Sequence, residues 1–221
     1  MFRERLRASF AHIGQALREP EEFALRWHRE GAPYAWWVFV ALALTAIAGT
    51  SAYGLSMGVL GGPARMLACA QSCTVAAGLA WALPLPALYI LNSMSGSRLR
   101  ISTTFLAALV TTSWGGLALI ASIPINWFFT VAIPDRLFVL AVNLVIFAGV
   151  VVAMVDVFSR VIAGLEPNRG RWPTFWLVLV GAIGGELFYA FGLFDWSAMN
   201  EIKEWLITQS LVSGPQSVVS S

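Results

Sequence analysis

The chain is poor in charged residues: Asp, Glu, Lys and Arg make up 12% of its 221 residues, whereas 58% are hydrophobic. Soluble domains carry about 25% charged residues, so this composition predicts an integral membrane protein. The formal net charge of +2 is too small to indicate nucleic acid as a partner. The lipid bilayer is therefore the first partner that the composition predicts.

Histidine and cysteine are also scarce. His12 and His28 are the only histidines and both lie in a charged N-terminal segment, so no histidine base is expected inside the membrane. Cys69 and Cys73 lie one helical turn apart, where a regular helix rarely allows a disulfide. We expect both to behave as small apolar side chains. The motifs of serine hydrolases, zinc proteases and phosphate-binding loops are missing. We therefore predict no enzyme, no metal and no cofactor.

Five apolar segments are long enough to cross a membrane, which takes about 20 residues. They lie at about residues 34–55, 71–92, 103–123, 137–157 and 173–194. We predict an all-α integral membrane protein, a bundle of five transmembrane helices over residues 34–194 with interfacial amphipathic helices at both termini. No apolar segment precedes residue 34, so we expect no signal peptide.

Both predicted terminal segments are amphipathic. In residues 1–33, apolar residues recur every three or four positions between Phe2 and Leu17, which is one face of a helix. Pro20 then breaks the chain, and a second short helix begins after it. Such a helix either lies in the membrane interface or packs on the bundle. Residues 195–221 read as an external amphipathic helix followed by a disordered tail, and residues 124–134 as a segment along the outer interface. The basic residues expected at the membrane surface are Arg3, Arg5, Arg7 and Arg18.

The distribution of Arg and Lys predicts the orientation. The N-terminal segment and the loops at residues 93–102 and 158–172 hold eleven of them, and the opposite side holds three. By the positive-inside rule the N-terminus is cytoplasmic and the C-terminus is periplasmic or external. Thirteen of the fourteen basic residues are Arg, which suggests a GC-rich bacterial genome and hence the bacterial inner membrane.

Three polar residues within the predicted spans are candidates for function. Glu186 follows three glycines in the fifth span, and an intramembrane carboxyl is a functional hypothesis by default. One interpretation is that it binds a proton, a cation or a partner's Arg; the other is that it stays protonated and bonded to a nearby hydroxyl or to Asn143 of the fourth span. Asp156 precedes Arg160 by four residues, the spacing of a helical ion pair, and a local pair is the favoured interpretation.

The second predicted span carries two prolines, Pro84 and Pro86. Each removes a backbone N–H and frees the carbonyl four residues earlier, and an unpaired carbonyl is costly in lipid. We expect a kink buried against the third span, whose Ser and Thr hydroxyls would bond the freed carbonyls. Asn92 would supply a polar partner near the inner face.

The segments together resemble the Yip1-domain membrane proteins, most closely their bacterial relatives. The likeness covers about residues 8–160. It rests on Leu17, Pro20 and Phe23 in an L-x-x-P-x-x-F pattern, on SAYGLSMG at residues 51–58 and on LPLPALYILNSMSG followed by SRLR. The resemblance implies a non-enzymatic membrane protein, since eukaryotic members act in membrane trafficking with small GTPases.

Two functions from different classes follow. The first is a non-catalytic scaffold or accessory subunit that associates with other membrane proteins, with itself or with lipid. The second is a transport or ion-coupling component that uses Glu186 and the proline-broken span, as discontinuous helices do in carriers. An intramembrane enzyme is a third, less favoured interpretation.

Overall fold

The computed structural model describes residues 14–30, 34–94, 96, 97, 99–167, 172–194, 204, 207 and 208, without the side chains of residues 91, 92 and 172–176. Every regular element in these residues is a helix, so the predicted all-α class is confirmed. Four helical stretches are long and apolar enough to cross a membrane: Trp36–Met57, Val59–Ile90, Ile101–Ala132 and Arg136–Leu165. A fifth apolar stretch, Leu177–Ala190, is shorter.

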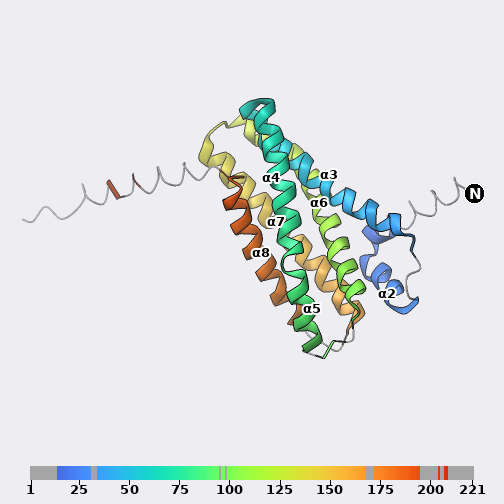
Figure 1. Ribbon diagram of the computed structural model, residues 1–221. Helices are drawn as coiled ribbons and strands as arrows, with labels where there is room; N and C mark the ends of the chain where they lie inside the picture. Colours follow the sequence, from blue (N-terminus) through green and yellow to red (C-terminus); the bar gives the residue numbers. More distant parts are fainter. Residues whose placement is uncertain are drawn as a thin grey trace, which may run out of the picture.

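Figure 1 shows the order of the helices along the chain. They are α2 (Pro20–Glu30), α3 (Trp36–Met57), the short 3-10 turn η1 (Val59–Gly61), α4 (Gly62–Ala82), α5 (Leu85–Met94), α6 (Ile101–Ala132), α7 (Arg136–Leu165) and α8 (Trp172–Ala190). The α4 helix begins well before residue 71, the expected start of the second span, because Pro63 in its first turn favours helix initiation.

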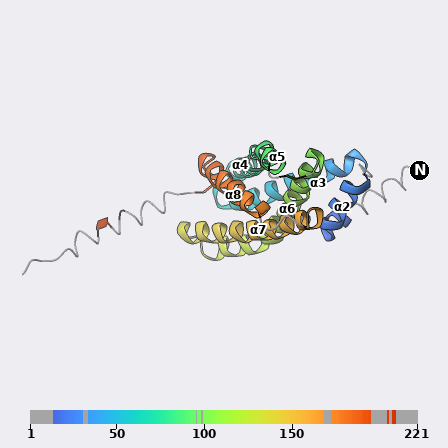
Figure 2. The ribbon, with the colours of Figure 1, turned by 90° about the horizontal axis from the view of Figure 1, so that it is seen from below.

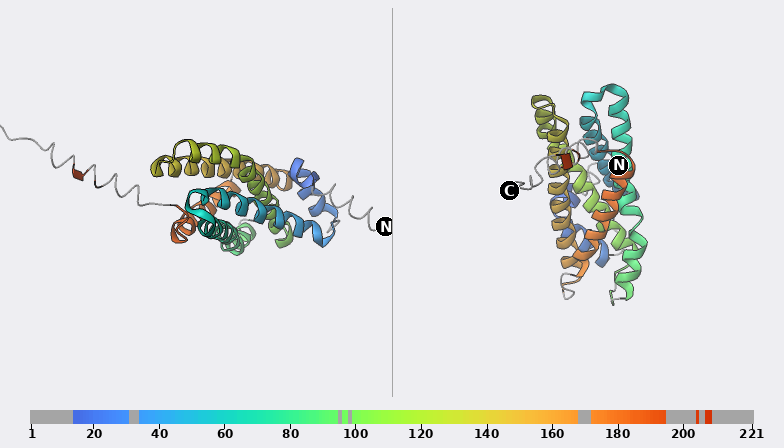
Figure 3. Two further views of the ribbon diagram at one scale, coloured as in Figure 1. Left: turned by 90° about the horizontal axis from the view of Figure 1, so that it is seen from above. Right: turned by 90° about the vertical axis from the view of Figure 1, so that its left-hand side faces the viewer.

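The helices close into a ring. The α3 helix packs on α4 and α6, α6 on α7, and α8 completes the circle between α4 and α7. Seen along the bundle, α4 and α5 lie opposite α7, with α6 and α8 between them (Figure 2). The turns of the α3–α4 and α6–α7 hairpins lie at one end, here called the hairpin end (Figure 3). The opposite end, beside α2, is called the α2 end.

Close backbone approach fixes α3 between its neighbours. A Cβ on Gly49 would lie 2.2 Å from the carbonyl oxygen of Gly116 in α6, and one on Gly54 would lie 2.6 Å from the backbone of Ala70 in α4. Small residues allow such contacts between membrane helices.

The predicted interfacial segment at residues 124–134 is wrong. The α6 helix continues through Pro124 to Ala132, which makes it about 48 Å long. Asn126 and Thr130 are fully buried on this extension, and Asn126 donates a hydrogen bond to Ser56 of α3. That buried contact holds the extension on the bundle and accounts for its helical structure.

Candidate functional site: an apolar cavity inside the helix ring

A buried polar network ties the hairpin end together. The Tyr53 hydroxyl donates to Asn143 Oδ1 over 2.8 Å, and Asn143 Nδ2 donates to the Val139 carbonyl of its own helix over 2.8 Å. Nearby, Asn126 Nδ2 donates to Ser56 Oγ over 3.0 Å, and Ser56 donates to the Tyr53 carbonyl over 2.7 Å. Asn143, singled out from the sequence, therefore joins α7 to α3 as a structural residue in this network.

The ring surrounds a partly open cavity of about 530 Å³ between α3, α4, α6, α7 and α8. None of its described lining residues is charged, and apart from Trp81 the polar ones are Thr50, Thr74 and Thr112. These hydroxyls are already occupied: Thr50 donates to Thr74 over 3.2 Å, and Thr112 donates to helix carbonyls. The cavity therefore suits an apolar ligand and offers no group for acid–base or metal chemistry.

Missing side-chain volume creates the cavity. Its walls include three glycines of α8, at positions 181, 184 and 185, and Gly78 of α4. A Cβ added at Gly78, Gly181 or Gly185 would meet no atom within 4 Å, whereas one at Gly184 would touch Ala80 at 3.4 Å. The glycines preceding Glu186 thus form part of the wall of the cavity.

The apolar walls decide what can fill this cavity, which is partly open to the surroundings of the bundle. Water is a poor filling, because each buried water needs two to four polar partners. The walls therefore favour a ligand with an apolar body.

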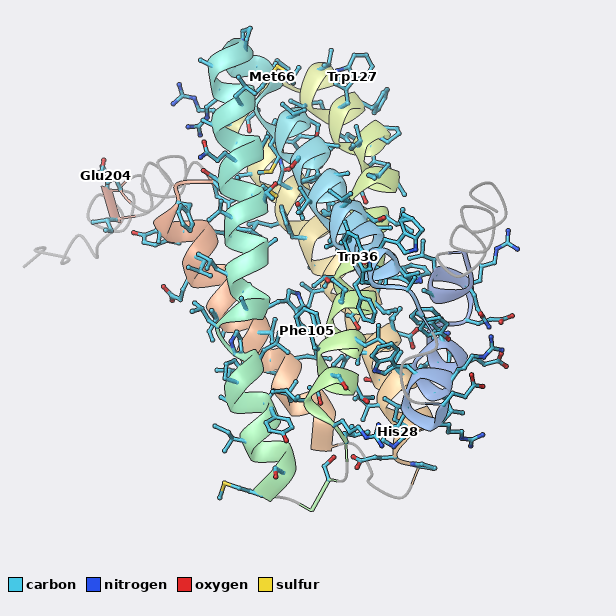
Figure 4. The ribbon with its side chains drawn as sticks, turned by 45° about the vertical axis from the view of Figure 1, so that its right-hand side comes forward. His28, Trp36, Met66, Phe105, Trp127 and Glu204 are labelled. Carbon is cyan, nitrogen blue, oxygen red and sulfur yellow. The ribbon has the colours of Figure 1, made fainter. Side chains whose placement is uncertain are left out.

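The cavity reaches the surface of the bundle. Phe105 of α6, 51% exposed, lies between α6 and the α4–α5 pair (Figure 4) and lines the cavity, as does Ile47 of α3, which is 49% exposed. At the α2 end, Trp81, Leu88, Phe158 and Leu177 pack into a buried core. Access is therefore lateral, from the lipid phase.

The α2 end carries an ion-pair cluster. Arg160 lies 3.1 Å from Asp156 in its own helix, which confirms the predicted pair, and its Nη1 lies 3.1 Å from Glu21 of α2. On the same helix, Phe23 is fully buried and its ring stacks on the ring of Tyr34, with 4.1 Å between the ring centroids. Residues 14–30 therefore pack on the bundle, whereas residues 2–13 of the predicted amphipathic helix lie outside the described residues.

Tyr34 helps to hold α2 on the bundle. Its hydroxyl donates to the Phe23 carbonyl over 3.2 Å, and burial raises the pKa of the phenol above its ordinary value, so it stays protonated and keeps donating. Further along the bundle, Trp114 Nε1 donates to the Leu17 carbonyl over 2.8 Å. Sequence periodicity indicated the apolar face of this segment but not that Trp114 would bind it.

Glu186 lies on the opposite side of α8 from the cavity. Its side chain is exposed, and it accepts no hydrogen bond from a described residue. The expected donors are used elsewhere: Thr111 bonds the Ala107 carbonyl, and Ser113 bonds the Leu42 carbonyl of α3 over 2.7 Å. The structure therefore separates Glu186 from the hydroxyls of α6 and from Asn143.

The proline pair interrupts the second span. A turn at Leu83 and Pro84 separates α4 from α5, and Ala80 and Ala82 on the α4 side line the cavity. The hydroxyls of Thr111, Thr112 and Ser113 donate to carbonyls of α6 or α3, so the expected bonds to Ala80 and Ala82 are not formed. The kink contributes to the cavity wall, while Glu186 does not.

Some predicted sites have no structural account. Arg3, Arg5 and Arg7 lie outside the described residues, as does the Asn92 side chain, whereas Arg18 is exposed. The predicted C-terminal helix lies almost entirely outside them too. Sequence reasoning missed Tyr53 and Asn126, although an amide in an apolar stretch was a usable signal for Asn126.

No family model matches the chain. No curated protein and no solved structure matches it either.

Proposed function

We propose that the chain is a non-catalytic, five-span scaffold or accessory subunit of the bacterial inner membrane, similar to Yip1 proteins, with a cytoplasmic N-terminus and an external C-terminus. In this proposal α8 is the fifth span. Tyr53, Asn126 and Asn143 support it, because the intramembrane polar groups that a reaction would need are used to bind helix to helix.

The proposal depends most on the exposed outer face of α8. Val178, Glu186 and Tyr189 share this face, and Val178 and Tyr189 are 65% and 62% exposed. An ionisable residue facing lipid is unfavourable by several kcal/mol, so a polar group of a neighbouring protein is a better environment for Glu186. We infer that this face, called the α8 face, contacts another membrane protein or a second copy of the chain.

Site-specific photo-crosslinking in native membranes tests the α8 face. A photoreactive amino acid at Val178 should give one discrete protein adduct, and Glu186→Leu should reduce its yield at least fivefold. Val145 of α7, 71% exposed, is the matched control and should label lipid. Equal protein labelling at the two positions, or none at Val178, would contradict the proposal.

A further inference from the structure

We propose that the cavity binds one acyl chain of a membrane phospholipid. This inference concerns the opposite side of α8 from the α8 face and does not depend on the proposed function. It begins with size: a methylene group occupies about the volume of a water molecule, about 30 Å³. The 530 Å³ of the cavity therefore leaves room for one long acyl chain.

The shape of the cavity favours the same ligand. Its α6 wall runs from Phe105 to Leu119, fourteen helical steps or about 21 Å along a helix. One leaflet of the hydrocarbon core is about 15 Å thick, so an extended chain can lie along this wall.

Access and chemistry point to a lipid already in the bilayer. The edge at Ile47 and Phe105 is apolar and half exposed, so a chain can enter sideways while its headgroup stays in the interface. The described lining residues carry no charge for a carboxylate or phosphate inside the cavity. The site therefore selects the hydrocarbon part and leaves the polar part outside.

Filling the cavity with side chains tests the proposal. Gly181→Leu combined with Gly185→Leu places two isobutyl groups where a Cβ meets no atom within 4 Å. Leucine is also a better helix former than glycine, so folding is retained. Gly149→Leu is the control, since Gly149 has the same open surroundings on α7 but does not line the cavity. Gly78→Leu fills the cavity independently from the α4 wall.

The measurement is native mass spectrometry of the full chain, reconstituted in phosphatidylglycerol vesicles and then washed in mild detergent. The unsubstituted chain and the Gly149→Leu variant should each retain about one phospholipid. The double variant Gly181→Leu/Gly185→Leu and the Gly78→Leu variant should each retain at least tenfold less. Equal retention in the filled variants would overturn the proposal. Absence of lipid from the original chain, or a bound fatty acid or other apolar molecule in its place, would overturn it too.

Discussion

The Tyr53–Asn143 bond gives the sharpest test of how the polar network holds the bundle. Tyr53→Phe removes the hydroxyl that donates to Asn143 Oδ1 over 2.8 Å and keeps the ring, which packs edge-on against Phe147 at 5.3 Å. Asn143 retains its bond to the Val139 carbonyl, so only one acceptor loses its partner. Such a loss costs about 1–3 kcal/mol in soluble proteins, and coupling between membrane helices averages about 0.6 kcal/mol. We expect the unfolding free energy to fall by about 0.5–2 kcal/mol.

Cys73 supplies the assay. It is fully buried and packs with Met57 of α3 and with Phe147, so a maleimide reaches its thiol only when the bundle opens. Alkylation across an SDS titration, in a Cys69→Ala background, gives the unfolding midpoint. A double-mutant cycle with Asn143→Leu should give a coupling of about 0.6–1.7 kcal/mol. An unchanged midpoint for Tyr53→Phe and zero coupling would refute the reasoning.

Four further predictions concern the packing and the proposed topology. Gly49→Leu should abolish monodisperse behaviour in size-exclusion chromatography, because its Cβ would lie 2.2 Å from the α6 backbone, whereas Gly149→Leu should elute as the parent chain does. Phe23→Ala should release α2, since truncating a buried Phe costs about 3–5 kcal/mol, and hydrogen exchange of residues 20–30 should rise. Arg160→Ala should change that exchange little, because exposed ion pairs contribute about 1 kcal/mol or less. A reporter fused after residue 214 should be external, and a cytoplasmic signal would contradict the five-span proposal.

Composition and local spacing were enough to predict the helical class, the apolar helices and the Asp156–Arg160 pair. These features depend on the chain's own hydropathy or on residues one turn apart. Hydropathy failed at residues 124–134, because it does not show that Asn126 and Thr130 are buried on an extended α6. Whether residues 14–30 lie on lipid or on the bundle depends on partners such as Trp114 and Arg160, which are distant in sequence.

The cavity could not be predicted either. Glycines at positions 181, 184 and 185 read as a surface for close helix packing, and elsewhere Gly116 does serve that purpose. In α8, Gly181 and Gly185 instead face open space. Whether such space exists depends on the positions of α3, α4 and α7, which are distant in sequence. The same helix geometry places Glu186 on the outer surface of α8. The sequence had suggested that it belongs to an interior site.

The mass of the particle released from native membranes in mild detergent tests the account most directly. The account predicts the chain together with a polypeptide partner, or a second copy, and about one phospholipid per chain. Glu186→Leu should lose the polypeptide and keep the lipid, whereas Gly181→Leu with Gly185→Leu should lose the lipid and keep the polypeptide. A bare, single chain from the original membranes would contradict both assignments.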